Sequence, residues 1–452
     1  MTPRNRTSLK QRALGAGGWS MAGYGINQAI RLAGNLVMTR LLVPEMFGVM
    51  AIATTVIVIL GLMADIGVQQ NVVQSRRGDD PVFLDTAWTV QIVRGFVLWI
   101  LAILLSIGLY LAGGAGMLPD KSVYASPVLP SVLAVSSFTA VIAGFQSTKV
   151  AAAYRSFDGK RLFQINLIAQ LAGLIVMIVI GVIGRSIWAL VAAGLVGALT
   201  TTVLSHVWLS GHANHFRWEK NALQEMVGFG KWVFVSSVAS VLAMNGDRLL
   251  LGGFVEADLM GLYAIAAMII SAIVGALIRL GGSVSLPALS EIARNDPSRL
   301  REVYYKLRVP TDLLLLFLSG LLFAAGQLLI DLLYDSRYSG AGGMLRILAL
   351  SLFAARYEVA RAMYVAMGIP RYWTVISLVR FVSLYALVPT LYYLAGAQAA
   401  IWGIALHGLA AVPFFYAFGS RFRLNDFRRE FVVLLALPVG YLGGMGLNLL
   451  RG

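Results

Sequence analysis

Long apolar runs, separated by short polar segments, follow one another along the whole chain and predict membrane-spanning helices. A span needs roughly twenty mostly apolar residues, because a helix rises about 1.5 Å per residue and the hydrocarbon core is about 30 Å thick. Two sets of six runs meet this requirement, and one further run follows them. The runs lie near residues 15–41, 46–74, 83–112, 127–152, 163–184 and 187–210, then 229–253, 259–286, 310–332, 343–367, 372–395 and 398–419, and last 431–450. We therefore expect an all-α, polytopic transmembrane bundle.

The last run, 431–450, leaves two arrangements open. As a thirteenth span it places the C-terminus on the side of the membrane opposite to the N-terminus. As a short hairpin or an interfacial segment it leaves both termini on the same side. Hydropathy alone does not choose between them.

Composition supports a membrane protein. Hydrophobic residues make up 58% of the 452 residues and charged residues only 13%, whereas soluble proteins carry about a quarter charged residues. The sequence has no cysteine, which excludes disulfides, thiolate metal sites and cysteine nucleophiles. The formal charge of +15 is typical of cytoplasmic loops that rest on anionic headgroups, and we expect no nucleic-acid partner.

Basic residues set the expected orientation. The polar, basic start at residues 1–12 is unlike a signal peptide, and placing it in the cytoplasm puts most of the 36 Lys and Arg in cytoplasmic loops. This predicts a multi-pass protein of the bacterial inner membrane with a cytoplasmic N-terminus. The segment 288–308, with apolar residues on one helical face among basic ones such as Arg308, predicts a helix that lies on the inner leaflet.

The two sets of six runs are related as repeats. A gapless alignment pairs Gly48 with Gly261, Glu45 with Asp258, and Ala-Ile-Ala at 51–53 with the same residues at 264–266. Both sets start in the cytoplasm, so the repeat is parallel, with its axis along the membrane normal. The expected divisions are an N-terminal six-helix lobe at 1–213, a C-terminal six-helix lobe at 226–420, and a basic loop with the extra hydrophobic segment at 421–452.

Several basic residues fall inside the predicted spans, where each costs about 2.5 to 3.5 kcal/mol if it faces lipid. Lys149, Arg279 and Arg346 lie near helix ends, from which a long side chain reaches the interface. The deeper cations are Arg31, Arg94, Arg356, Arg361 and Arg380, and the main interior acids are Asp65, Asp85 and Glu358. The cations therefore outnumber the acids.

Two interpretations of these charges stay open. In the first, they pair, Arg31 with Asp65 and Arg361 with Glu358, and fix the arrangement of the helices. In the second, the surplus cations line a wet cleft between the lobes and attract an anionic substrate. In that case Asp65, Asp85 and Glu358 serve charge pairing or coupling.

The sequence contains no recognisable catalytic arrangement: no Walker loop, no HExxH and no GxSxG. The longest expected outer loop, 113–126, is too short to hold a catalytic domain. We therefore expect no enzyme activity, no cofactor and no metal ion. A membrane-embedded polysaccharide polymerase or ligase is the disfavoured alternative from another class.

Three motifs open the second set of runs. They are Phe-Gly-x-Trp at 229–232, Asp-Arg-x-Leu-Leu-Gly at 247–252 and Gly-x-Tyr-Ala-Ile-Ala at 261–266. Together with the segments 34–53 and 64–74, they make a sequence that resembles the Wzx-type oligosaccharide flippase, or polysaccharide transporter, family. This family lies within the multidrug/oligosaccharidyl-lipid/polysaccharide (MOP) exporter superfamily. The resemblance covers nearly the whole chain.

The resemblance implies a flippase. Such a protein moves an undecaprenyl-pyrophosphate-linked oligosaccharide repeat unit from the cytoplasmic to the periplasmic leaflet by alternating access, for exopolysaccharide or O-antigen assembly. It is expected to work beside a polymerase and a chain-length regulator. Asp247 and Arg248 occupy the family's Asp-Arg motif, which either binds substrate or acts as a gate or structural pair. The alternatives are a lipid II flippase and a drug/cation antiporter of the same superfamily, and the cationic surplus disfavours the antiporter.

Overall fold

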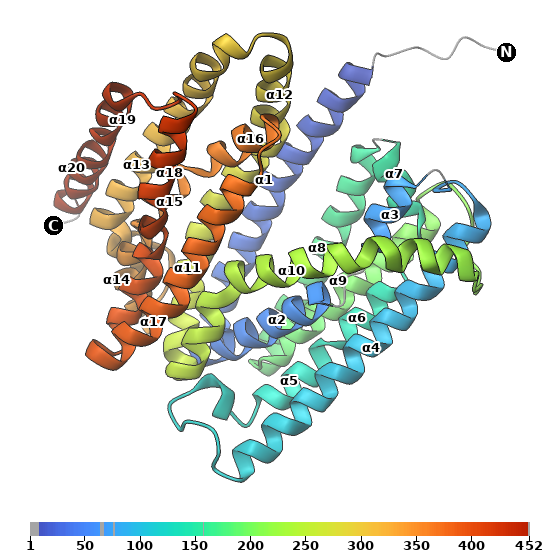
Figure 1. Ribbon diagram of the computed structural model, residues 1–452. Coiled ribbons are helices and arrows are strands. Elements are labelled where there is room, and N and C mark those ends of the chain that lie inside the picture. The colour runs from blue at the N-terminus through green and yellow to red at the C-terminus, as the bar shows by residue number, and fades with distance from the viewer. Residues whose placement is uncertain (1–8, 64–66, 76, 157, 451–452) are drawn as a thin grey trace. The chain divides into compact units, whose positions relative to one another are not determined.

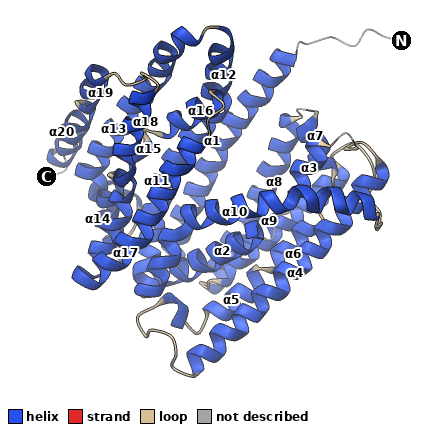
Figure 2. Ribbon diagram, viewed as in Figure 1, coloured by secondary structure: helices blue, strands red, loops and turns tan. Residues whose placement is uncertain are grey.

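In this computed structural model, which describes residues 9–63, 67–75, 77–156 and 158–450, each predicted apolar run is mainly helical where it is described. Figure 2 shows helices joined by loops, with no strand in this part of the chain. Among these residues, eight helices are long and apolar enough to cross a membrane, or nine if one bent pair counts as a span. The all-α, polytopic architecture expected from the sequence is confirmed.

Close contacts divide the chain into two compact units. One unit contains Met1–Leu42 and Val49–Asn245, and the other contains Val43–Gly48 and Gly246–Gly452. The division falls inside one helix, α10 (Lys220–Phe254). The lobe limits expected from the sequence stay a prediction.

The first unit follows the first set of predicted runs (Figure 1). Its helices are α1 (Leu9–Leu41), α2 (Pro44–Met63, without its first turn), α3 (Val68–Gln74), α4 (Pro81–Gly114), the 3-10 turn Val123–Ala125, α5 (Leu129–Ser136), α6 (Phe138–Gly144), α7 (Lys149–Arg155), α8 (Gly159–Gly184), α9 (Trp188–Val207) and most of α10. The predicted span 127–152 is bent by 67° between α6 and α7. Helix α4 starts at a capping residue, because the Asp80 carboxylate accepts a hydrogen bond from the Val82 N–H.

The second unit contains the end of α10 and the second set of runs. Its further elements are α11 (Ala257–Leu280), the π-helical turn η2 (Gly281–Ser285), α12 (Leu286–Asn295), η3 (Pro297–Arg299), α13 (Leu300–Leu333), η4 (Ser336–Tyr338), α14 (Gly340–Ala349), α15 (Ser351–Ala355), α16 (Glu358–Ala366), α17 (Arg371–Leu406), η5 (His407–Ala411), α18 (Val412–Arg421), α19 (Phe427–Leu434) and α20 (Ala436–Leu449). The predicted span 343–367 is divided among α14, α15 and α16.

Helix α17 reverses direction near its C-terminal end. Ala395 and Gly396 leave the helical conformation, and Gly396 takes a φ of 77°, which glycine adopts without steric cost. Beyond this turn the chain packs back on itself. The approach is close, since a Cβ at Gly403 would lie 3.2 Å from the Leu391 side chain. The predicted runs 372–395 and 398–419 therefore form a helical hairpin.

The segment 288–308 differs from its prediction. It is not a single helix: α12 ends at Asn295, and residues 300–308 are the first turns of the long α13. The predicted run 310–332 begins at Pro310, a residue that removes one helical hydrogen bond. The helix continues through it, and the Thr311 hydroxyl donates to the Leu307 carbonyl in the same turn. Arg308 was expected in this cytoplasmic segment, but it lies on α13 and is buried.

The last apolar run packs along α13, and Figure 1 shows α20 beside that helix. The backbones approach so closely that a Cβ at Gly440 would lie 2.0 Å from the Phe317 carbonyl oxygen, and one at Gly320 would lie 2.0 Å from that of Leu437. Residues Phe427–Leu449 also meet the length and apolarity criteria of a span. Both observations favour residues 431–450 as a thirteenth span over a short hairpin or an interfacial segment.

A symmetric crossing occurs inside the second unit, between the first turn of α2 and the first turns of α11. A Cβ at Gly48 would lie 1.9 Å from the Ala257 carbonyl oxygen, and a Cβ at Gly261 would lie 1.9 Å from that of Pro44. Gly48 and Gly261 are paired by the sequence repeat, and the same alignment pairs Pro44 with Ala257. Equivalent residues of the two repeats thus make reciprocal contacts.

Candidate functional site: a buried charge network

Four charged side chains meet inside the second unit. Arg308 and Asp312 lie on α13, Arg356 lies between α15 and α16, and Glu430 lies on α19. Arg308 and Arg356 are each only 1% exposed. We refer to these four residues as the charge network. Its formal charges cancel, two positive against two negative.

Each carboxylate of the charge network contacts both arginines. Glu430 Oε2 lies 2.9 Å from Arg308 Nη2 and 3.3 Å from Arg356 Nη2. Asp312 Oδ2 lies 3.1 Å from Arg308 Nε and 3.7 Å from Arg356 Nη1. Glu430 therefore makes the shorter contacts, and these contacts tie α19 to α13.

Aromatic side chains surround the charges. The hydroxyls of Tyr305 and Tyr416 donate to the two carboxylate oxygens of Glu430 at 3.2 and 3.1 Å. The Tyr357 ring lies against both guanidinium groups, with its centroid 4.9 Å from Arg308 Cζ and 4.7 Å from Arg356 Cζ. Cation–π contacts of this kind contribute about 2 kcal/mol when they are desolvated.

Hydrogen bonding within the charge network is incomplete. Among the described residues, Arg308 Nε, Asp312 Oδ1 and Arg356 Nε and Nη1 have no hydrogen-bond partner. Arg308 Nε is close enough to Asp312 for an ion pair but is not aligned for a hydrogen bond. In a low-dielectric interior such groups depend on the neighbouring charges, so the loss of one charge strongly affects the other three.

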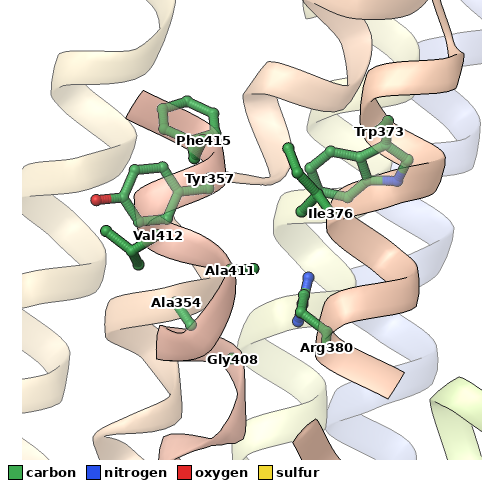
Figure 3. A pocket seen from close by; sticks show the side chains of 9 residues that line it. All are labelled: Ala354, Tyr357, Trp373, Ile376, Arg380, Gly408, Ala411, Val412 and Phe415. Carbon is green, nitrogen blue, oxygen red and sulfur yellow. The ribbon is translucent and has the colours of Figure 1, made fainter. Parts of the chain in front are cut away.

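A small cavity lies beside the charge network (Figure 3). In the figure, Trp373, Ile376 and Arg380 project from α17 on one side, opposite Gly408 and Ala411. The cavity volume is about 10 Å³, which suffices for about one water molecule. It is therefore too small to be a substrate pocket.

Arg380 also belongs to a second ion-pair group. Its Nη1 donates to Glu358 Oε1 at 3.1 Å, and Arg361 Nε lies 3.6 Å from the other oxygen of the same carboxylate. Glu358 thus has two cationic neighbours, and the group carries a net positive charge. Arg361 and Arg380 remain partly exposed, with 43% and 29% of their side-chain surfaces accessible.

A larger groove of about 790 Å³ runs along the first turns of α13 and the start of α19. Its charged lining residues include Glu302, Lys306, Asp426, Arg428 and Arg429. Tyr305 also lines this groove and donates to Glu430, so its hydroxyl joins the groove to the charge network.

The structure places the predicted site residues in different surroundings. Arg356 is enclosed by two carboxylates, whereas Arg361 and Arg380 share Glu358, so the expected pairing of Arg361 with Glu358 is found. Arg31 is exposed on α1 and Arg94 is half-buried on α4. Asp65 lies outside the described residues, so its pairing with Arg31 stays a prediction.

Two residues of the quoted motifs come together. The Tyr263 hydroxyl on α11 donates a short hydrogen bond to the Asp247 carboxylate on α10. Tyr263 is only 1% exposed, and Asp247 and Arg248 are half-buried. This geometry joins α10 to α11, as a structural pair would do.

Sequence reasoning missed Arg308, Asp312 and Glu430 as site residues. Asp312 lies within the predicted run 310–332, and an acid inside a span is by itself a candidate for function. Arg308 stands four residues before it, the spacing that puts two side chains on one helical face. No pattern in the sequence indicated that Glu430 would join them.

A family model for "Polysaccharide biosynthesis protein" matches residues 37–342, more than half of the chain. The chain belongs to this polysaccharide biosynthesis protein family. The matched range contains Arg308 and Asp312, whereas Arg356 and Glu430 lie beyond it. The family resemblance inferred from the motifs is confirmed.

Relatives of this polysaccharide biosynthesis protein include transporters. The succinoglycan biosynthesis transport protein ExoT of Rhizobium meliloti (strain 1021) is 20% identical over 360 residues, which cover 78% of this chain and 68% of ExoT. Among solved structures, the inward closed lipid II flippase MurJ aligns with a TM-score of 0.71 and 13% identity, over 94% of this chain and 91% of MurJ. An inward-facing MATE family multidrug resistance transporter of the MOP superfamily aligns with a TM-score of 0.68 and 14% identity, over 88% of this chain and 94% of that chain. At these identities the structural likeness establishes the fold, which is that of MOP transporters.

Proposed function

We propose that this protein is a flippase that moves a lipid-linked oligosaccharide repeat unit across the bacterial inner membrane. The observation that carries the proposal is membership of a polysaccharide biosynthesis family by a chain with a multi-pass MOP transporter fold. Supporting it, ExoT is named as a succinoglycan transport protein and MurJ as a lipid II flippase. The protein would carry its substrate from the cytoplasmic to the periplasmic leaflet by alternating access, without changing it chemically.

The proposed substrate is an oligosaccharide on undecaprenyl diphosphate, and its charge suits the interior cations. Arg31, Arg94, Arg361 and Arg380 are the candidates to attract the diphosphate or acidic sugars, since a cation in an enclosed polar path concentrates anions. Arg361 and Arg380 support this role best, because together they exceed the charge of Glu358 and stay partly exposed. Arg356 is neutralised by Asp312 and Glu430, so we assign it to helix packing.

Location and partners follow from the same proposal. The distribution of basic residues favours a cytoplasmic N-terminus in the inner membrane. A flippase of this class delivers its cargo to a polymerase and a chain-length regulator in the periplasm, which are the protein partners that we propose.

A drug/cation antiporter is the second candidate. One structural observation, the number of interior carboxylates, weakens the argument from the sequence against it. Asp312 and Glu430 add two carboxylates to the interior acids, so the cationic surplus is smaller than the sequence suggested. Both carboxylates are enclosed by arginines, however, and an organic cation needs an acid that can be reached. The flippase therefore remains the better proposal.

Deletion of the gene tests the function directly. If the protein is the flippase, complete lipid-linked repeat units accumulate on the cytoplasmic leaflet and surface polymer is lost. Normal surface polymer together with a loss of drug tolerance would overturn the proposal in favour of the antiporter.

Single substitutions test the cationic residues. We expect Arg380→Ala to reduce export and Arg380→Lys to retain part of it, because lysine keeps the charge and loses the planar geometry. Arg337→Ala is the matched control, since Arg337 pairs with Asp335 in the turn after α13 and is not among the interior cations. Export by Arg380→Ala at the level of Arg337→Ala, with equal amounts of protein in the membrane, would exclude Arg380 from the substrate path.

A further inference from the structure

Three metal-ligating side chains converge in the first unit, away from the charge network. Asp85 lies near the start of α4, and His212 and His215 lie on the segment that connects α9 to α10. Their possible ligand atoms all lie within 4.8 Å of one another. The chain has only four histidines, and two of them take part in this cluster.

Direct contacts hold the cluster together. Asp85 Oδ1 lies 2.8 Å from His212 Nε2 and accepts a hydrogen bond from the His215 backbone N–H at 2.9 Å. The Asp85 side chain is only 6% exposed, and that of His212 is 25% exposed. The His215 side chain is exposed, and its ring centroid lies 6.0 Å from that of His212. The buried carboxylate is thus fixed by both contacts, whereas the His215 imidazole is the outermost of the three groups.

Hydrogen bonds fasten the connecting segment between the two histidines and after them. Asn214 accepts hydrogen bonds from the Ser147 hydroxyl and the Thr148 N–H. The Glu219 N–H donates to the Thr86 hydroxyl at 3.2 Å. These bonds hold His212 and His215 beside the first turns of α4 without using either imidazole, as a preorganised ligand set requires.

We propose that Asp85, His212 and His215 bind a divalent transition-metal ion of the zinc class. Two imidazoles and a carboxylate suit zinc, which takes nitrogen and oxygen ligands at about 2.0 to 2.2 Å. Two ligand atoms on one tetrahedral ion lie about 3.3 Å apart for bonds of this length. The 2.8 Å contact between Asp85 and His212 must therefore open slightly, and the His215 ring must turn inward. Water takes the fourth position.

The ion would fasten the segment between α9 and α10 to α4. In its absence the same segment is held by the hydrogen bonds already described, so the metal adds stability to a preformed arrangement. This inference goes beyond the transport proposal and departs from the expectation of no metal. Asp85 was expected to serve charge pairing or coupling. In this proposal its partners are His212 and His215 of the connecting segment, and not an interior arginine.

Metal binding by the full chain is the test. The protein is purified with a tag that contains no histidine, treated with a chelator, and titrated with ZnCl₂, with binding followed by calorimetry and by metal analysis after gel filtration. We expect one equivalent of zinc in the wild-type protein. Co²⁺ in place of zinc should give the visible absorption of a tetrahedral nitrogen and oxygen site.

His215→Ala is the decisive variant, because its exposed side chain makes no hydrogen bond in this cluster and its loss should leave the fold intact. We expect at least a tenfold weaker affinity for zinc in His215→Ala and His212→Ala, and loss of the zinc-dependent rise in thermal stability. His206→Gln is the matched control, since His206 contacts the Phe145 carbonyl outside the cluster.

Two outcomes would overturn the proposal. One is an absence of stoichiometric zinc in the folded wild-type protein. The other is zinc binding that His212→Ala and His215→Ala weaken no more than His206→Gln does, which would leave the cluster as a hydrogen-bonded loop anchor.

Discussion

Glu430→Gln removes one negative charge from the charge network and keeps the shape of the side chain. Glu430 lies 2.9 Å from Arg308 and 3.3 Å from Arg356, and both arginines are almost fully buried. The substitution changes the formal charge of the cluster from zero to +1. Because a buried charge without its partner is strongly unfavourable, we expect a loss of about 3–5 kcal/mol in unfolding free energy.

This loss should appear as a lower melting temperature. A domain of 150–250 residues shifts by about 2–4 °C per kcal/mol, so we expect a decrease of about 6 °C or more. The assay is thermal unfolding in detergent, followed by tryptophan fluorescence and by gel filtration of the heated sample. Asp312→Asn should cause a smaller decrease, because Asp312 lies farther from the same two arginines, at 3.1 and 3.7 Å.

Glu302→Gln is the control for the loss of a carboxylate. Glu302 pairs with Arg299 at 3.5 Å, and both side chains are more than half exposed, so its contribution is within about 0.5 kcal/mol. If Glu430→Gln melts within experimental error of Glu302→Gln, the reasoning about the charge network is wrong. An unchanged melting temperature combined with lost export would instead make Glu430 a transport residue.

Three other predictions concern backbone contacts and a helix cap. Gly440→Val should destabilise the protein by several kcal/mol and detach α20 from α13, whereas Gly446→Val, with open space around it, should be neutral in the same melting assay. Gly48→Ala should lower the yield of folded protein in gel filtration, because its Cβ would overlap a carbonyl oxygen. Asp80→Ala should cost about 0.5–2 kcal/mol at neutral pH. The hydrogen bond from Arg77 lowers the pKa of Asp80 below 3.8, so this stabilisation is present above about pH 4 and disappears as the pH falls through the lowered value. Melting temperatures of the wild type and Asp80→Ala should therefore converge in acid.

The apolar runs predicted the helices well, because membrane helices need length and apolarity, and both can be read from one sequence. Bends were less predictable. The run 127–152 was expected to be one span, yet it contains a 67° bend between α6 and α7, at the polar residues 146–149. In the opposite sense, the run 310–332 was expected to begin a span at Pro310, yet α13 already begins at Leu300 and continues through the proline.

Site residues were predicted where partners are close in sequence. Arg361 and Glu358 lie three residues apart on one helix, and their pairing followed from that spacing. Glu430 meets Arg308 from a distant helix, and the cluster of Asp85 with His212 and His215 joins a helix to a later connecting segment. Such contacts depend on tertiary structure, so no local pattern reveals them.

The position of Glu430 near the end of the chain affects the order of events during synthesis. Arg308 and Arg356 leave the ribosome well before Glu430 does. At about 5–20 residues per second, the delay after Arg308 is on the order of ten seconds. During this interval only Asp312 offsets the two arginines, so the incomplete charge network carries an excess positive charge. Final assembly of the second unit must therefore wait for the last helices, and a nascent chain stalled before Glu430 should be a substrate for membrane quality-control proteases.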